Sequence, residues 1–374
     1  KVPNELLEIG VLADATNFSQ SILISQDAGT GTLSTAGDNT GLGFDVFDDL
    51  TSGDFNTAVG SSALSKLTTG SENVAIGGNA LDANTTASFN VAIGTSALGA
   101  NTTGTNNVMV GTNAGDAITT SNNNTGVGHD VLGATTTGDL NTAMGSTALN
   151  TNTTGANNTG IGYAALTANT TGTANTAVGV NAGAALTTGG YNVAVGRQAL
   201  NATTTVNDNV AVGNNALRLN TTGANNTGIG SSSLDANTTG VRNVAVGALA
   251  LSSNTTADDN VAVGGGTSGV SFAALQSNTT GANNTAVGNG ALGANTTASA
   301  NSAFGYSALL DNTTGESNTA LGKDALRANT TGSNNVAVGT DCLTANTTGD
   351  SNTAMGLDAM LTNTTGNYNT AVFC

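Results

Sequence analysis

The sequence predicts an all-β protein, a parallel β-solenoid (β-roll) of 17-residue coils. The first observation is a period: from Gly43 to Gly264 a glycine recurs every 17 residues, and after one interval of 24 residues the spacing resumes at Gly288. The second is the segment that ends at each glycine, Asn-Thr/Val-Ala-Val/Ile-Gly, in which large and small side chains alternate as they do in a β-strand. A short fixed period indicates a solenoid, in which each repeat packs only on its neighbours.

The repeat divides the chain into two parts. Residues 1–38 do not repeat, and we expect them to form an N-terminal cap or an attachment segment that contains two short strands. Residues 39–374 hold 19 complete coils and a partial one. We number the positions within a coil as columns one to seventeen, beginning at Asn39. The longer interval places a 7-residue insertion near residues 265–271.

The alternation within the strand sets which side chains we expect inside a coil. Columns two and four are large or β-branched, whereas column three is Ala or Gly everywhere except at Met109. We expect column four and the leucine of column nine to fill the core, and the small column three to face a second chain at close approach. The predicted core residues include Val59, Leu64, Val178, Leu217, Ile118 and Leu186.

Two coils bear on the idea of a shared core layer. Column nine is glycine at Gly115 and Gly183, and in the same coils column twelve, elsewhere mostly Asn, becomes Ile118 and Leu186. The apolar volume has moved by three residues rather than disappeared, as close packing between coils requires. Column twelve is also apolar in two coils whose ninth column is intact, so compensation and coincidence both stay open.

Asparagine fills column one in all 20 coils. Stacked side-chain amides can hydrogen-bond from coil to coil, so we expect a structural ladder that includes Asn56, Asn73, Asn90, Asn175 and Asn352. The alternative for a row of amides is binding of sugars or ions, although a binding site does not need every rung. Column twelve often begins Asn-Thr-Thr, a glycosylation sequon, but coils about 4.8 Å apart cannot all carry a glycan.

Composition argues against several classes of partner and of chemistry. A net charge of −17 with only seven scattered Lys and Arg argues against nucleic acid. No apolar run approaches the roughly 18 residues of a membrane helix, so we expect no membrane insertion. The single histidine, His129, has no repeated acid or cysteine beside it. We therefore predict no catalytic residue, no metal site and no cofactor, and we expect that the protein is not an enzyme.

The insertion is the candidate binding loop. Its residues follow directly after the glycine of column five, where the coil turns: Gly265, Gly266, Thr267, Ser268, Gly269, Val270 and Ser271. Insertions in solenoids map to surface loops and often to binding faces. An insertion that is merely tolerated is the alternative.

Two other functions fit the sequence less well. A polysaccharide lyase on a β-helical scaffold needs a cluster of carboxylates in a groove, whereas the acidic residues here are dispersed over turn columns. An ice-binding protein needs a broad threonine face. Adjacent residues of a strand point to opposite sides, so only one of the neighbouring threonine columns, thirteen and fourteen, can face solvent.

The repeated motif Asn-[Thr/Val]-Ala-[Val/Ile]-Gly-x-x-Ala-Leu resembles the head repeat of trimeric autotransporter adhesins. It is also similar to repeats in tail-fibre-like proteins of marine bacteriophages, and residues 13–24, Ala-Asp-Ala-Thr-Asn-Phe-Ser-Gln-Ser-Ile-Leu-Ile, resemble the phage sequences in particular. The resemblance implies a left-handed parallel β-roll, three chains around an axis, and a fibre that is extracellular or carried on a virion.

The expected function is that of a structural and attachment fibre, with a bacteriophage tail or surface fibre favoured. A bacterial surface adhesin or a self-assembling extracellular filament is the alternative. The expected partners are further copies of the chain, as a homotrimer, and a cell-surface glycan or host receptor. The apolar residues Leu6, Leu7 and Ile9 could also pack on the unfinished last coil of another copy, which would give a head-to-tail filament.

Overall fold

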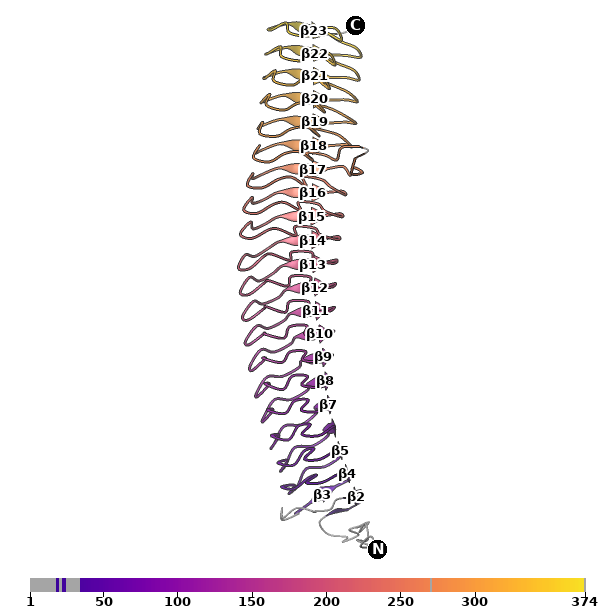
Figure 1. Cartoon of the computed structure of the whole chain (residues 1–374), viewed down its shortest axis with the longest axis vertical. Helices are drawn as coiled ribbons and strands as arrows, with labels where there is room; N and C mark the ends of the chain where they lie inside the picture. The colour runs from indigo at the N-terminus through magenta and orange to yellow at the C-terminus, as the bar shows by residue number, and fades with distance from the viewer. Residues whose placement is uncertain (1–17, 20–21, 25–33, 270, 373–374) are drawn as a thin grey trace. The chain divides into compact units, whose positions relative to one another are not determined.

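The computed structural model describes residues 18–19, 22–24, 34–269 and 271–372, and in these ranges the regular secondary structure consists of short β-strands. Each coil contributes one three-residue strand from columns two to four (Figure 1). The predicted all-β parallel solenoid of 17-residue coils is confirmed.

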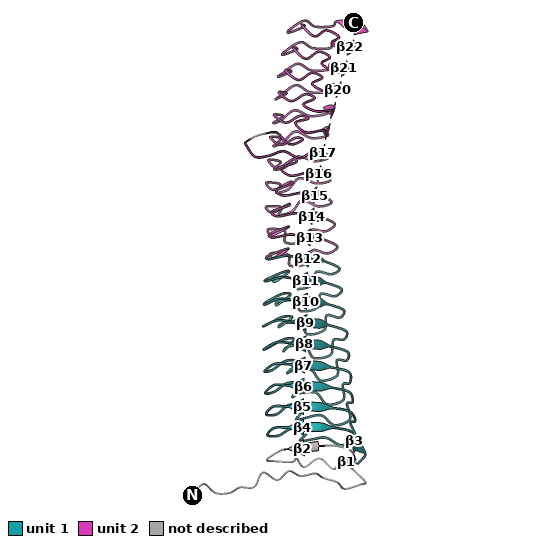
Figure 2. Cartoon of the chain, turned by 90° about the vertical axis from the view of Figure 1, so that its right-hand side faces the viewer, with its two compact units in different colours: residues 1–180 teal, residues 181–374 magenta. Residues whose placement is uncertain are grey.

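The chain divides into two compact units, residues 1–180 and residues 181–374, coloured separately in Figure 2. Val270 of the insertion and the strand expected around Leu6 and Leu7 lie outside the described residues.

In the first unit, parallel pairing holds the strands in constant register. Its strands are β1 (Phe18–Ser19), β2 (Ile22–Ile24), β3 (Ala36–Gly37), β4 (Thr40–Leu42), β5 (Thr57–Val59), β6 (Val74–Ile76), β7 (Val91–Ile93), β8 (Val108–Val110), β9 (Thr125–Val127), β10 (Thr142–Met144), β11 (Thr159–Ile161) and β12 (Thr176–Val178). Thr57 pairs with Val74, and Val74 pairs with Val91, so each rung is displaced by one repeat. Ahead of the repeat, β2 pairs in parallel with β4 and extends the ladder by one rung.

The second unit keeps the same register across the insertion. Its strands are β13 (Val193–Val195), β14 (Val210–Val212), β15 (Thr227–Ile229), β16 (Val244–Val246), β17 (Val261–Val263), β18 (Thr285–Val287), β19 (Ser302–Phe304), β20 (Thr319–Leu321), β21 (Val336–Val338), β22 (Thr353–Met355) and β23 (Thr370–Val372). Although β17 and β18 are separated by the longer interval, Val261 pairs with Thr285 and Val263 with Val287. The additional residues are therefore accommodated outside the ladder.

Backbone hydrogen bonds outside the strands also join successive coils. The Leu64 N–H donates to the Ala80 carbonyl at 3.1 Å, and the Thr68 N–H donates to the Thr85 carbonyl at 2.8 Å. The glycine of column five is needed where the backbones approach most closely. Gly60 has a φ of 132°, and a Cβ placed on it would lie 2.6 Å from the carbonyl oxygen of Gly77.

Column nine adopts a left-handed backbone conformation, which the sequence pattern did not reveal. Leu64 has a φ of 51° and Leu217 a φ of 49°, and the same conformation recurs at column nine in the other described coils. β-branched residues disfavour this region strongly, and column nine contains Leu, Phe, Met or Gly but never Val, Ile or Thr. Where column nine is leucine, its side chain is thus directed inward by an unusual backbone.

The inside and outside of the strand are the reverse of the prediction. Ala58 and Ala177 of column three are fully buried, whereas Val59 and Val178, which were predicted as core, are only partly buried. The reason is the thinness of the coil: a Cβ placed on Gly160 of column three would lie 3.3 Å from Cγ of Leu149 in column nine. Only a small residue fits opposite the leucine, so column three cannot face a second chain.

The other four predicted core residues are confirmed. Leu64, Leu217 and Ile118 are fully buried and Leu186 is 1% exposed. The compensation between columns nine and twelve is also supported, because a Cβ placed on Gly115 would lie 2.9 Å from Cδ1 of Ile118. Met109, the one large residue of column three, shares the vacated space, since the same Cβ would lie 3.0 Å from its Cγ.

Candidate functional surfaces

The outer face of the strands carries an apolar row with no cover from its own chain. Every described residue of column four is at least partly exposed. The more exposed members are Leu42, Ile76, Ile93, Met144, Ile229, Val263, Phe304, Leu321, Met355 and Val372, at 36–50%. Column two, which is Thr or Val in most coils, lies on the same face because side chains alternate along a strand. We call columns two and four the outer row.

Aromatic side chains border the outer row instead of filling the core. Among the aromatic residues in the described ranges 34–269 and 271–372, only Phe47 is buried. Eight of the exposed ones lie in columns four, six and seventeen, on or beside the strand: Phe44, Phe55, Phe89, Phe304, Tyr163, Tyr191, Tyr306 and Tyr368. Phe55, Glu72 and Val74 line a shallow hollow on this face. Exposed aromatic residues beside an apolar row are typical of interaction surfaces.

The predicted asparagine ladder is present in column one. The Asn73 side-chain Nδ2 donates to Oδ1 of Asn56 at 3.0 Å, and the Asn90 Nδ2 donates to Oδ1 of Asn73 at 3.3 Å. The rungs at Asn175 and Asn352 also donate a backbone N–H to the Oδ1 of the preceding rung, at 3.0 and 2.9 Å. Because these amides are buried and occupied within the chain, the ladder is structural, and the sugar- or ion-binding alternative is not supported.

A second asparagine ladder runs along column twelve, and sequence reasoning missed it. Asn237 donates through Nδ2 to Oδ1 of Asn220 at 2.8 Å, and Asn254 donates to Oδ1 of Asn237 at 2.8 Å. Both donors also bond a carbonyl of column fifteen, Gly240 and Ala257 respectively, at 3.0 and 3.1 Å. These asparagines are fully buried, so the repeated sequon reflects packing rather than sites for glycans.

The two threonine columns have different environments, as predicted. In column thirteen, the hydroxyl of Thr68 donates to the Thr85 carbonyl of the next coil at 2.9 Å, and that of Thr238 donates to the Thr255 carbonyl at 2.9 Å. In column fourteen, threonines such as Thr239 are exposed. One threonine row is therefore committed to joining coils, and one row faces solvent.

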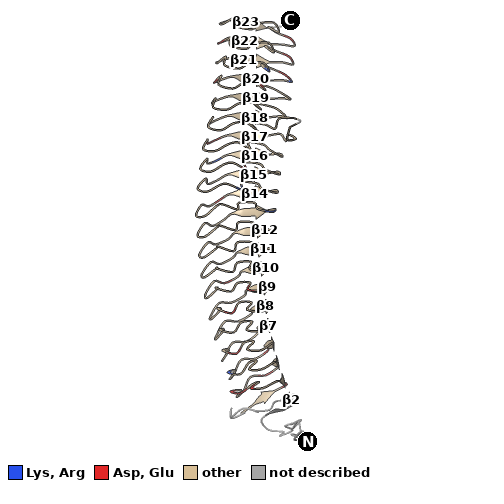
Figure 3. Ribbon diagram, in the orientation of Figure 1, with Lys and Arg blue, Asp and Glu red and all other residues tan. Residues whose placement is uncertain are grey.

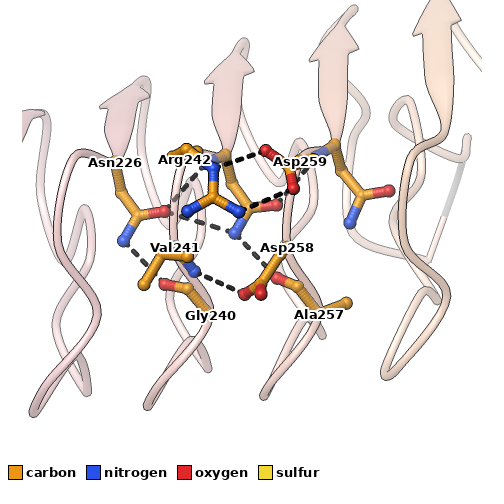
Figure 4. Close-up of polar contacts among 9 residues, drawn as sticks. Asn226, Gly240, Val241, Arg242, Ala257, Asp258 and Asp259 are labelled. Atoms are coloured by element: carbon orange, nitrogen blue, oxygen red, sulfur yellow. Dashed lines mark hydrogen bonds and ion pairs between the residues drawn. The ribbon is translucent and has the colours of Figure 1, made fainter.

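Charged side chains are sparse, and some pair between neighbouring coils. Figure 3 shows the charged residues spread thinly along the ribbon. In the second unit, Arg218 donates through Nε to Asp235 at 2.9 Å. Arg242 donates through Nε and Nη2 to the two carboxylate oxygens of Asp259 at 2.7 and 2.8 Å (Figure 4). The Arg242 guanidinium lowers the pKa of Asp259. Asp258 instead accepts from the backbone N–H of Val241 at 2.8 Å. These charges act between coils of one chain rather than converging on a reaction centre.

Acidic residues on the turns are partly desolvated. Burial raises the pKa of Asp82, and burial together with the nearby Asp130 carboxylate raises the pKa of Asp116. In the described ranges no group of three or more His, Cys, Asp or Glu residues is placed to hold a metal ion. Within those same ranges, no helix is long and apolar enough to span a membrane.

The insertion is anchored to the coil on either side. The Gly266 N–H donates to the Ala248 carbonyl at 2.9 Å, and the Asn289 side chain donates to the Gly265 carbonyl. Thr267 and Ser271 exchange backbone hydrogen bonds at 3.1 and 3.0 Å and close a small hairpin.

Comparison of this chain with models of known protein families and with curated protein sequences gives no match. What the structure itself supports is the coarser part of the resemblance, a repeating parallel β-solenoid with Asn, Thr and Val in fixed columns.

Proposed function

We propose that the chain is the subunit of a structural and attachment fibre in which copies associate through the outer row. The observation that carries this proposal is the uninterrupted series of large apolar side chains that column four leaves half-exposed in both units. Soluble monomers rarely expose contiguous apolar patches larger than a few hundred Å², and larger patches mark interaction sites.

The size of the outer row is sufficient for association. A column-four residue that is 39% exposed, such as Ile76, leaves on the order of 70 Å² of apolar surface, and covering it contributes about 1.5–2 kcal/mol. Ten neighbouring coils of one unit then offer roughly 700 Å², close to the ~800 Å² per partner of a stable protein interface. Three copies around an axis, as the resemblance implies, would set each outer row against its two neighbours.

The rest of the proposal follows from the resemblance and from the absence of a convergent reactive cluster in the sequence. We assign the fibre to the outside of a cell or to a virion, with a bacteriophage tail or surface fibre favoured over a bacterial adhesin or filament, and with no enzymatic activity. Purified phage particles that contain peptides of this chain beside capsid and tail proteins would support the virion assignment. Recovery of the chain only from bacterial surfaces would contradict it.

Association through the outer row is tested by adding charge to it. We expect lysine at six column-four positions, one in every third coil, to lower the mass measured by light scattering from that of three chains to that of one, because unpaired charges would be buried. The six positions are Ile76, Val127, Val178, Ile229, Val287 and Val338.

The matched control adds the same six charges to the same coils at exposed column fourteen: Thr86, Thr137, Thr188, Thr239, Thr297 and Thr348. We expect this variant to keep the wild-type mass, with circular dichroism confirming that both variants fold. A wild-type protein that is monomeric at all concentrations, or equal masses for the two variants, would refute the outer row as the interface. A wild-type dimer would refute only the threefold arrangement.

A further inference from the structure

The coils that follow the insertion are shaped to receive it. Phe272, the first residue after the inserted segment, packs over Gly293 of the next coil, where an added Cβ would lie 2.7 Å from the Cβ of Phe272. The same added Cβ would lie 3.0 Å from Cδ1 of Leu310, one coil further. A glycine at column ten is therefore required beneath Phe272, which argues that the insertion is a built feature and not merely a tolerated one.

The backbone of the insertion is also fitted to its place. An added Cβ on Gly266 would lie 2.6 Å from the Ser271 carbonyl oxygen, so only glycine allows the two ends of the hairpin to approach. Gly269, at the tip of the hairpin, has a φ of 74° and no heavy atom near its missing side chain. Hydrogen bonds from the coils on either side thus fix Gly265 and Gly266, where the inserted segment begins.

A hollow of about 280 Å³ lies between the hairpin and the coil, lined by Gly269, Ser271, Phe272 and Gln276. Its volume is just below the range typical of drug-sized ligand sites, roughly 300–1,000 Å³. Phe272 is 43% exposed and presents an apolar surface to it. None of the four lining residues is charged.

The polar groups of the hollow are oriented by the chain itself. The Gln276 Oε1 accepts from the Ala273 N–H at 2.9 Å, and among the described residues nothing accepts from its Nε2, which has two donors. The Ser271 hydroxyl oxygen accepts from the Thr267 N–H at 3.2 Å, which leaves the hydroxyl proton available. An aromatic side chain, a fixed amide and a hydroxyl thus meet in an uncharged site.

We propose that this hollow binds one neutral pyranose ring of a glycan. The C–H face of a sugar ring is apolar and packs on an aromatic side chain, here Phe272, while its hydroxyls match the amide of Gln276 and the hydroxyl of Ser271. An anionic sugar is disfavoured, because no cation lines the site and the chain carries a net charge of −17. The inference names a ligand class for the proposed attachment role and so rests on it.

Ligand-observed saturation-transfer NMR on the full chain tests the proposal and does not depend on oligomeric state. The probes are the methyl glycosides of glucose, galactose, mannose and N-acetylglucosamine, with methyl glucuronide as the anionic comparison. We expect at least one neutral glycoside to receive saturation and the glucuronide to receive less. Phe272→Ala should weaken that binding by about tenfold or more, because the ring-stacking surface is lost.

Two further variants test whether sugar binding depends on the hollow itself. Deleting residues 265–271 restores the 17-residue spacing of the other coils, so the protein should fold and lose sugar binding. Leu219→Ala removes an apolar side chain of similar exposure, 40%, that lies outside both the hollow and the outer row, and it should leave binding unchanged. The site is refuted if no neutral glycoside binds, if the glucuronide binds best, or if binding survives in both Phe272→Ala and the deletion. Self-association measured separately would leave the fibre proposal standing in each of those cases.

Discussion

Asn243 provides the sharpest test of the column-one ladder. Its backbone N–H donates to Oδ1 of Asn226 at 2.9 Å, and its Nδ2 donates to the same oxygen at 3.2 Å and to the Ala257 carbonyl at 2.8 Å. Its own Oδ1 accepts the backbone N–H of Asn260 at 3.0 Å. Figure 4 labels the preceding rung, Asn226, beside the Gly240 carbonyl to which its Nδ2 donates at 2.8 Å. Asn243→Ala removes the side chain and keeps the backbone.

The cost can be worked out from the groups that lose a partner. The Asn260 N–H, which is buried, loses its acceptor, and an orphaned buried donor costs about 1–3 kcal/mol. The Ala257 carbonyl keeps a bond from Asn254 at 3.1 Å and loses little. With a small contribution from the missing amide, we expect Asn243→Ala to destabilise the protein by about 2–4 kcal/mol. The effect should be confined to adjoining coils, because each coil of a solenoid contacts only its nearest neighbours.

A substitution in the second ladder is the matched comparison. Asn254 has the same amide and the same burial, but its Oδ1 accepts from the Asn278 side chain at 3.2 Å instead of a backbone N–H. Asn278 keeps its bond to the Gly281 carbonyl at 2.9 Å, so Asn254→Ala leaves no backbone donor without a partner. It does remove the donor to Oδ1 of Asn237, but the Oδ1 atoms of Asn101 and Asn169 in the same column already lack one, so the fold accommodates that loss. We expect Asn254→Ala to cost less than Asn243→Ala.

Hydrogen exchange measured by mass spectrometry reports the local destabilisation caused by each of the two substitutions. With Asn243→Ala, exchange at Asn260 should accelerate by roughly 30-fold or more, since each 1.4 kcal/mol is about tenfold. Exchange in coils several repeats away should not change. An equal or larger effect from Asn254→Ala, or an acceleration spread over the whole chain, would show that the reasoning about column one is wrong.

Two further predictions address column nine and the turns. Leu217→Ile keeps the volume but puts a β-branched residue at a φ of 49°, so we expect about 1–2 kcal/mol of destabilisation in hydrogen exchange, and less for Leu217→Met, since Met360 occupies the same column at a φ of 52°. An equal cost for the two variants would contradict the backbone argument. The pKa of Asp116 is raised above its ordinary 3.8 in the folded chain, so the ionised carboxylate destabilises the folded state. This destabilisation is lost as the pH falls through the raised folded pKa, because the carboxyl group then becomes protonated. Asp116→Asn should remove that part of the pH dependence of melting between about pH 3 and 7, and an unchanged profile would refute it.

The period, the parallel register and the glycine and asparagine columns could be predicted because each has a local cause. Parallel pairing in constant register requires the same number of residues between successive strands. The turn at Gly60 has no room for a side chain. The side-chain amide of Asn73 donates to the coil before it and accepts from the coil after it. These requirements recur unchanged in each coil, so the repetition itself displays them. Column twelve could have been recognised by the same reasoning, because its asparagine is as regular a feature as many of the turn residues.

The alternation of side chains alone could not show which face of the strand points into the coil. Period-two patterning tells which residues share a face, but it does not tell which face is inside. The rule that large apolar residues are buried assigned Val59 to the core, whereas Ala58 is buried because Leu64 and its neighbours already fill a thin coil. The one related feature of the sequence is that column nine lacks β-branched residues, which fits its left-handed backbone but does not by itself predict it.

The residues of column four are exposed and yet always apolar, and this combination needs a physical reason. Column seventeen is also exposed, and it holds residues as different as Glu72, Asn106 and Arg242, so exposure on this coil tolerates polarity. Column four is apolar in all 20 coils. A preference of strands for β-branched residues does not account for this, because Met144 and Leu321 are unbranched at Cβ and still apolar. The packing of a single chain does not require apolar residues in column four. An interface that excludes water along the outer row would require them. The six lysine substitutions described above distinguish a monomer from such an interface.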